Sequence, residues 1–232
     1  MTWTLVNLRG LSQMMFDMVD SGEDLHRLMA FLRDGHLAKL DYLQENGLLS
    51  LNNDGTYVGS GGFGWTTELP QPDFGGTVRT QDMWGFAESQ ETGVVSTRMF
   101  AEFVLPYQIP ILERFGLNCY GCCEPLDKRW SVVKDIPRLR RVSVSPWSSL
   151  PKMAELLGDR YIFSMKPNPA ALAMGSFDED YIRQGLRDAF RITRGCRVEA
   201  IMKDNHTIGN DPSRVVRWVQ IAREEAENAL HV

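Results

Sequence analysis

The stretch Leu117–Glu124 reads LNCYGCCE, and its pattern indicates the fold class of most of the chain. Its first residues form the short apolar run expected of a buried strand, and Gly121 then marks a tight turn. An amphipathic stretch through Trp130, Val133 and Ile136 follows and predicts a helix. A strand that leads through a short loop into a helix is the repeating unit of an α/β fold.

The same pattern of a strand followed by a helix recurs from about residue 80 onward. Beside the strand before the cysteines, we expect strands at residues 83–87, 141–145, 161–164 and 198–202. Helical spacing runs from 96 to 115, with a break or kink at Pro106 and Pro110, and returns at 150–157, from about 176 and from about 211. This alternation predicts a parallel sheet with helices outside it, in the manner of a TIM-barrel-like (β/α) fold.

Residues 1–80 have a different pattern, so we divide the chain into an N-terminal segment (1–80) and a βα-repeat portion (81–232). A helix is expected from Ser21–Asp24 to Asn46–Gly47, and residues 4–8 could add one strand. The glycine-rich stretch Gly59–Gly64 has no helix start after it. We therefore expect a mobile loop near the active site rather than a phosphate-binding loop.

Composition excludes several classes of protein. The 232 residues are 43% hydrophobic and 24% charged, as in an ordinary folded protein, and the net charge of −5 argues against a nucleic-acid partner. The one basic run, Arg138–Arg141, is short and is expected to be a solvated helix or loop end. No signal peptide or membrane-spanning stretch is evident, and clustered cysteines are unlike a secreted disulfide framework. We expect a cytoplasmic location.

Polar residues follow each of the five expected strands. They are Glu88 and Gln90 after the first, Cys122, Cys123 and Glu124 after the second, Trp147 after the third, Lys166 and Asn168 after the fourth, and Asp204 and His206 after the fifth. Because the ends of parallel strands share one face, these residues are expected to open onto one cavity. Each has a simpler interpretation: the thiols as small buried hydrophobes, Glu88 and Lys166 as solvated charges, and His206 as a packing residue.

Several separate motifs, in this order, carry a resemblance to a known family. They are Trp84–Tyr107, the strand with the cysteines, Val144–Trp147 and Asp204–Pro212. Together they resemble the uroporphyrinogen decarboxylase superfamily, and most of all its branch near the corrinoid-dependent methyltransferases. The resemblance implies a TIM barrel and, for that branch, a zinc ion that assists methyl transfer to or from a thiol or a corrinoid carried by a partner protein.

The resemblance also implies roles for individual residues. Cys122 matches the cysteine of a His-x-Cys zinc motif, although Tyr120 stands in place of the histidine, and His206 lies near the position of a second ligand. Cys123 or Glu124 would complete the zinc site. Glu88 and Asp204 would position or protonate the leaving group, while Gln90, Trp147 and Asn168 would contact the substrate. These are the assignments for a zinc-assisted methyltransferase.

Two other functions are open at this point. One is a decarboxylase-like lyase without a metal ion, in which Lys166 and nearby donors bind a carboxylated substrate. The other is a non-catalytic barrel subunit, because a complete barrel has eight strands and only five βα units are counted after residue 80. An open barrel exposes strand edges, so we expect a homodimer or a complementing chain to cover them.

Overall fold

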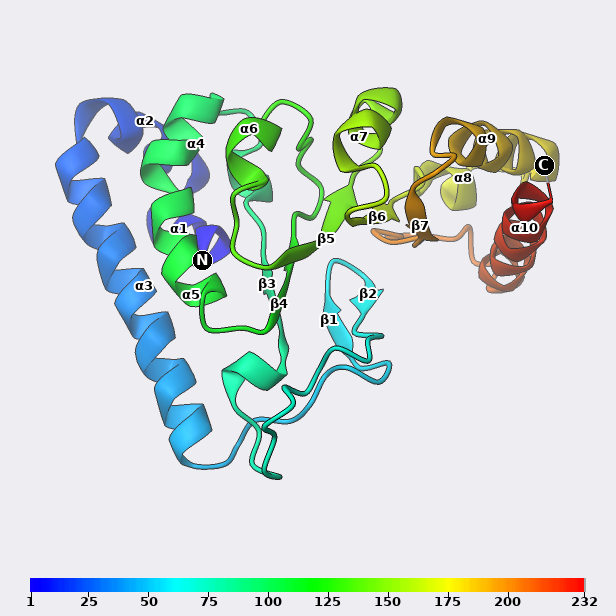
Figure 1. Ribbon diagram of the computed structural model, residues 1–232. Coiled ribbons are helices and arrows are strands. Elements are labelled where there is room, and N and C mark those ends of the chain that lie inside the picture. The colour runs from blue at the N-terminus through cyan, green and yellow to red at the C-terminus, as the bar shows by residue number, and fades with distance from the viewer. Residues whose placement is uncertain (232) are drawn as a thin grey trace.

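Five parallel strands form the main sheet in the sequential order β3-β4-β5-β6-β7 (Figure 1). The structure is a computed structural model that describes residues 1–231. The strands are β3 (Trp84–Ala87), β4 (Leu117–Tyr120), β5 (Leu139–Val144), β6 (Ile162–Met165) and β7 (Arg197–Ala200). All five expected strands are confirmed, with ends that differ by at most two residues. Within the described residues these strands form an open sheet rather than a closed barrel.

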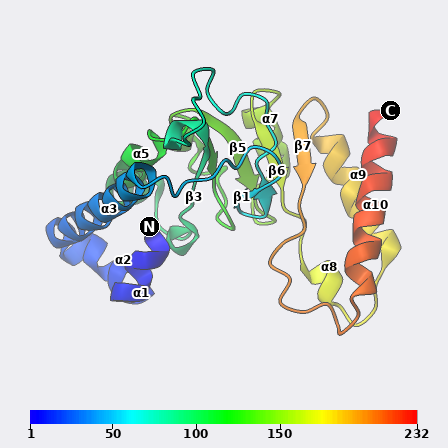
Figure 2. The same cartoon turned by 90° about the horizontal axis from the view of Figure 1, so that it is seen from below.

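The helices that follow the strands pack against one face of the sheet, except that the last one packs mainly on the helix before it. They are α4 (Thr97–Phe103), α5 (Leu105–Leu112), α6 (Trp130–Val133), α7 (Leu150–Leu157), α8 (Ala170–Ala173), α9 (Glu179–Ile192) and α10 (Ser213–Leu230). Tyr120, Val142 and Phe163 are fully buried on this face and belong to the main core. Pairing of Tyr120 with Val142, and of Val142 with Phe163, places them in one row across the strands. Figure 2 shows the strands following one another along an arc from β3 to β7.

The other, concave face of the sheet is polar. Alternation along each strand turns Arg141, Ser143 and Ser164 to this side, and Ser164 pairs with Glu199 across the sheet. Arg141 is almost fully buried. Its prediction as part of a solvated helix or loop end was wrong, because the run Arg138–Arg141 enters β5 and strand alternation brings Arg141 inside.

A short hairpin covers the concave face. It consists of β1 (Tyr57–Gly59) and β2 (Gly62–Phe63), joined by Ser60 and Gly61, whose φ angles of 51° and 79° are those of a type I′ turn. Phe63 O accepts a hydrogen bond of 2.6 Å from Arg141 Nη2. The glycine-rich stretch, expected as a loop, is thus part of a strand pair, because small residues allow the hairpin backbone to approach the sheet closely.

The N-terminal segment is helical: α1 (Thr2–Arg9), α2 (Leu11–Asp20) and α3 (Gly22–Glu45). The predicted third helix is confirmed, but the possible strand at residues 4–8 was wrong, since these residues lie in α1 with Leu5 buried. Leu5, Met14 and Leu25 share one hydrophobic core with the helices that follow. Two short 3-10 turns, Thr80–Asp82 and Gln90–Thr92, flank β3.

The last helix buries one side and exposes apolar residues on the other. Trp218 and Ile221 of α10 are buried, whereas Val215, Val216 and Val219 are exposed on the other side of the helix. Buried Glu225 anchors α10 to α9 by ion pairs of 2.8 Å with Arg183 and 2.7 Å with Arg187. Within residues 1–231 no helix is both long and apolar enough to cross a bilayer.

Candidate functional site

The thiols and Asp204 meet at the ends of β4 and β7, although 81 positions separate them in sequence. Cys123 Sγ donates a hydrogen bond of 3.0 Å to Asp204 Oδ2. Cys122 Sγ lies 3.7 Å from Cys123 Sγ. Asp204 adopts a φ of 61°, a left-handed conformation that is uncommon outside glycine and is enriched at functional sites. Three of the residues singled out in the sequence are therefore in one place.

Lys203, which the sequence did not single out, lies in the middle of this group. Its ammonium is 2.9 Å from Cys122 Sγ, 3.5 Å from Cys123 Sγ and 3.3 Å from Asp204 Oδ2. Burial lowers the pKa of Lys203, but the bond to Cys122 and the charges of the neighbouring groups outweigh it and hold the pKa above its ordinary value. Burial, followed by the hydrogen bond to Asp204, raises the pKa of Cys123 to about 12. Cys123 is therefore a neutral thiol that donates to the carboxylate.

Glu124 is hydrogen-bonded to the turn that carries Cys122 and Cys123. It is almost fully buried, and its two carboxylate oxygens accept hydrogen bonds of 2.8 Å from the Ser89 amide and 2.9 Å from the Cys122 amide. Burial raises the pKa of Glu124 despite these bonds. The carboxylate oxygens are thus committed to backbone donors, and Glu124 positions the turn.

Tyr120 lies on the opposite face of β4 from the concave surface. It is fully buried against the helices, and its hydroxyl donates a 2.8 Å hydrogen bond to Gln108 Oε1. Burial raises its pKa well above the ordinary value. The side chain at this position therefore packs in the core and faces away from the two sulfurs.

Glu88 follows β3 and is half-buried. Burial, reinforced by the carboxylates of Glu91 and Glu124, raises its pKa to about 7. Its Oε2 accepts a hydrogen bond of 2.8 Å from the backbone amide of Gln90, whose side chain is exposed. A carboxyl group that titrates near neutrality is suited to act as a general acid or base.

Lys166 follows β6 and is almost fully buried, with a relative exposure of 3%. Its ammonium donates to Ser164 Oγ on the concave face. Among residues 1–231 no carboxylate lies within ion-pair distance of it. Burial lowers the pKa of Lys166 to about 8, partly offset by the more distant Glu199. A buried ammonium with no acidic partner is costly and marks a candidate functional group.

Arg141 gives the concave face a second buried cation. Its Nε is 2.9 Å from Glu199 Oε1, and its guanidinium carbon lies 5.1 Å from the centre of the Trp84 ring. Its Nη1 is buried without a hydrogen-bond partner within the described residues. Arg141, Glu199 and Lys203 were not among the site residues predicted from the sequence. Polar residues at alternate positions of otherwise apolar strands were the signal that could have identified the first two.

Three other predicted residues are not part of these contacts. The side chains of Trp147, Asn168 and His206 are all exposed. Asn168 Oδ1 accepts a hydrogen bond of 3.0 Å from the Ala170 amide, so it shapes the start of α8. His206 forms no hydrogen bond or ion pair with any other residue of the range 1–231.

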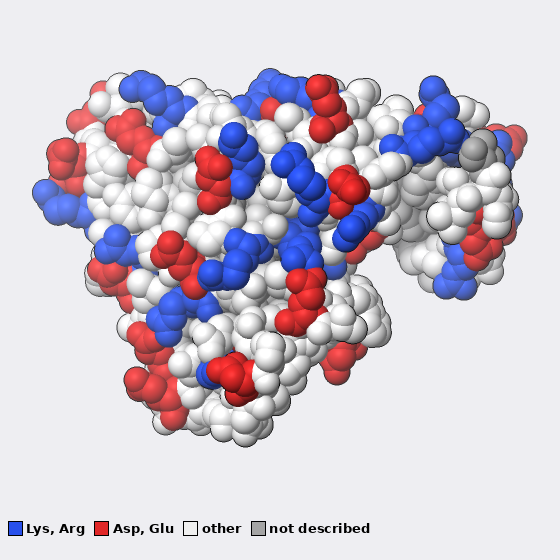
Figure 3. Space-filling view, viewed as in Figure 1, with Lys and Arg blue, Asp and Glu red and all other residues white. Residues whose placement is uncertain are grey.

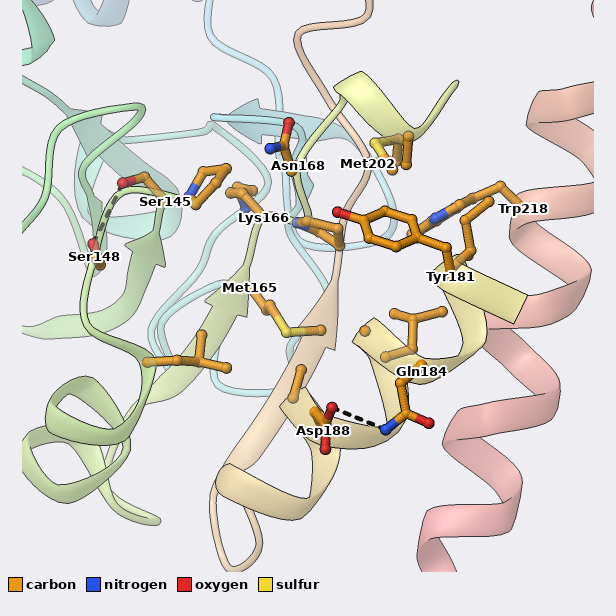
Figure 4. Close-up of a pocket in the computed structure, with 18 residues that line it drawn as sticks. Ser145, Ser148, Met165, Lys166, Asn168, Tyr181, Gln184, Asp188, Met202 and Trp218 are labelled. Atoms are coloured by element: carbon orange, nitrogen blue, oxygen red, sulfur yellow. Dashed lines mark hydrogen bonds between the residues drawn. The ribbon is translucent and has the colours of Figure 1, made fainter. Parts of the chain in front are cut away.

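A cavity of about 460 Å³ lies beside this region, between the sheet and α9 (Figure 4). Met165 and Met202 contribute apolar surface, while Ser145, Lys166 and Asn168 border it at the ends of the strands. Tyr181 and Trp218 approach it from α9 and α10 (Figure 4). The cavity therefore lies on the helix side of β6. The Lys166 amine turns to the concave side, where Ser164 binds it.

The thiol site does not fit a zinc ion in the arrangement seen. Within residues 1–231 no three His, Cys, Asp or Glu side chains are placed to hold a metal ion together. Glu124 is bonded to backbone amides and His206 is not among the contacts of the thiols. We therefore derive no reaction step through zinc or a corrinoid.

No protein-family model matches the chain, and neither does any curated protein. The uroporphyrinogen decarboxylase resemblance thus stands on the motifs alone. Lys, Arg, Asp and Glu are interspersed over the face seen in Figure 3, which has no extended surface of one sign.

Proposed function

We propose that this chain is a metal-independent lyase that binds a small carboxylated substrate through Lys166. The observation that carries the proposal is the buried Lys166 ammonium, which has no carboxylate within ion-pair distance among the described residues. A substrate carboxylate would supply the missing negative charge. A hydrogen bond between an ammonium and a carboxylate is stronger than one between neutral groups, and it is stronger still where water is scarce. The site therefore favours an anionic ligand.

Arg141 supports the same substrate class. Its Nη1, without a hydrogen-bond partner among residues 1–231, is a donor that a second carboxylate can accept from. The 2.6 Å hydrogen bond from Nη2 to Phe63 O and the ion pair with Glu199 hold the guanidinium in place. When a carboxylate leaves as CO₂, its electron pair stays on the neighbouring carbon. A cation held at that position stabilises the charge as it develops. We assign Lys166 to this task and Arg141 to holding the part of the substrate that does not react.

The carbon that loses CO₂ must also gain a proton. Glu88, whose pKa is about 7, follows β3, three strands away from β6, so its proton would reach that carbon only through intervening groups. The concave face is covered by the β1–β2 hairpin, which would keep water from the intermediate. We also propose that the five parallel strands are a portion of an incomplete (β/α) barrel and that a second copy of the chain covers its open edge.

The test uses a ligand pair that differs only in charge. Succinate should raise the melting temperature of the wild-type protein, whereas neutral succinamide should not. The variant Lys166→Met should lose the response to succinate, and Lys152→Met, a change of an exposed lysine on α7, should keep it. If Lys166→Met responds like the wild type, the carboxylate does not bind at Lys166. Release of CO₂ from 3-oxo acids then tests the reaction itself.

A further inference from the structure

We infer that Cys122 and Cys123 form a two-thiol clamp for a soft trivalent centre that carries one organic substituent, such as a monosubstituted arsenic(III) compound. Both side chains are partly accessible, and their sulfurs lie 3.7 Å apart at the end of β4. This inference concerns the thiols and stands apart from the proposed function of Lys166.

The two sulfurs are poorly placed for a disulfide bond with each other. The cysteines are neighbours in sequence, so a trans peptide holds their Cα atoms about 3.8 Å apart. Ordinary disulfides need about 4.4–6.8 Å between Cα atoms, and shorter separations store strain and make the bond easy to reduce. Oxidation of this pair is therefore opposed by the backbone.

One atom bonded to both sulfurs fits the same separation. With sulfur bonds of about 2.3 Å and the angle of a pyramidal trivalent centre, which is narrower than tetrahedral, the two sulfurs span about 3.5 Å. The observed separation is 3.7 Å, so a small rotation of the two side chains closes the bridge. No third protein ligand is in place among residues 1–231. The two thiols therefore suit a trivalent centre whose third bond is already made to its own organic substituent.

Lys203 and Asp204 supply the charges that the reaction needs. A cation beside a cysteine sulfur is the environment of reactive thiols, and Lys203 Nζ is 2.9 Å from Cys122 Sγ. Asp204 Oδ2 accepts from Cys123 Sγ at 3.0 Å and is placed to take up the proton of that thiol. Both act as positioning residues, since only the two sulfurs form bonds to the ligand.

The reaction is a condensation in which nothing is oxidised or reduced. An arsenoxide, R–As=O, reacts with the two thiols to give R–As(S)₂ bound to Cys122 and Cys123. Two As–S bonds form, the As=O bond breaks, and both thiol protons leave with the oxygen as one water molecule. Arsenic stays in the trivalent state throughout.

The experiment treats the purified chain with one equivalent of phenylarsine oxide and measures its intact mass. We expect one adduct per chain that survives excess 2-mercaptoethanol and is removed by the dithiol 2,3-dimercaptopropanol. Cys122→Ser and Cys123→Ser should each lose the stable adduct, while Cys196→Ser and Lys166→Met should retain it. Lys203→Met should form it about tenfold more slowly.

Three results would overturn the inference. Removal of the adduct by 2-mercaptoethanol would show that only one thiol binds. Retention of the stable adduct by Cys122→Ser would place it on other cysteines. Complete protection by equimolar zinc would show that the thiols belong to a metal site with further ligands. Loss of the succinate response in Lys166→Met bears on the proposed function alone.

Discussion

Replacing Lys166 by methionine should make the protein more stable, which is unusual for a change in the interior. Burial holds the pKa of Lys166 at about 8, compared with the ordinary value of 10.5. That difference corresponds to about 3 kcal/mol against the charged form in the folded state. Methionine has a similar length and no charge, so the folded state no longer carries this cost. The lost bond to Ser164 offsets roughly 1 kcal/mol of the gain.

The sign of the pH dependence follows from the depressed pKa. Below about pH 8 the amine is protonated in both the folded and the unfolded chain, so the full cost is present. Between pH 8 and 10.5 the unfolded chain binds more protons, and the wild type gains stability as the pH rises. The advantage of Lys166→Met should therefore be largest near pH 7 and should shrink toward pH 10.5.

Urea unfolding measures the free energy of unfolding of each protein. It is carried out at several pH values from 6.5 to 10.5 on the wild type, Lys166→Met and the surface control Lys152→Met. We expect Lys166→Met to gain about 2 kcal/mol at pH 7, or roughly 4–8 °C in melting temperature. Lys152→Met should follow the wild type. A constant difference between Lys166→Met and the wild type over this range would refute the reasoning, because packing effects do not titrate.

Three further changes test other parts of the structure. The pKa of Glu88 is raised to about 7, so the wild type should lose stability as the pH rises from 4.5 to 7, and Glu88→Gln should not show this loss. Thermal unfolding measures it, and the same pH profile in both proteins would contradict the prediction. Gly59→Ala should cost about 1–3 kcal/mol, because the added Cβ would lie 2.3 Å from an aromatic ring of β3, while Gly75→Ala, with open space around it, should cost little in the same urea titration. Glu225→Ala should cost about 1–3 kcal/mol through the lost hydrogen bonds, because Arg183 keeps Glu224 as a partner and the Arg187 side chain is largely exposed. Glu224→Ala, which removes a half-exposed carboxylate, should cost less than about 1 kcal/mol; equal losses would mean that burial of Glu225 is unimportant.

The strands of the main sheet could be predicted from the sequence because each is a short apolar run bounded by turn residues. Their parallel order followed from the helices between them. The break between α4 and α5 at Val104 was likewise predictable, since Pro106 is the second residue of α5 and disfavours one continuous helix, whereas Pro110 lies inside α5 without ending it. Closure into a barrel could not be derived, because it depends on strands that the described chain does not contain.

The thiols and Asp204 could be brought together from sequence because all three follow parallel strands. Lys203 was missed, since one lysine beside an aspartate resembles a solvated pair until burial is known. Arg141 was missed for a related reason: its neighbours Arg138 and Arg140 suggested a surface run, and only strand alternation separates the buried member from the others. Tyr120 could be assigned to the helix side only once its partner Gln108 was located in space.

The β1–β2 hairpin has a consequence for the order in which the molecule is assembled during synthesis. Ser60 bonds with Ser143 across 83 positions, and Phe63 bonds with Arg141 across 78. The hairpin therefore leaves the ribosome long before its resting place exists, and it can dock only after β5 has paired with its neighbours. Until then the cations of the inner surface remain hydrated, so their desolvation belongs to the last stage of folding, when late, long-range contacts close the structure.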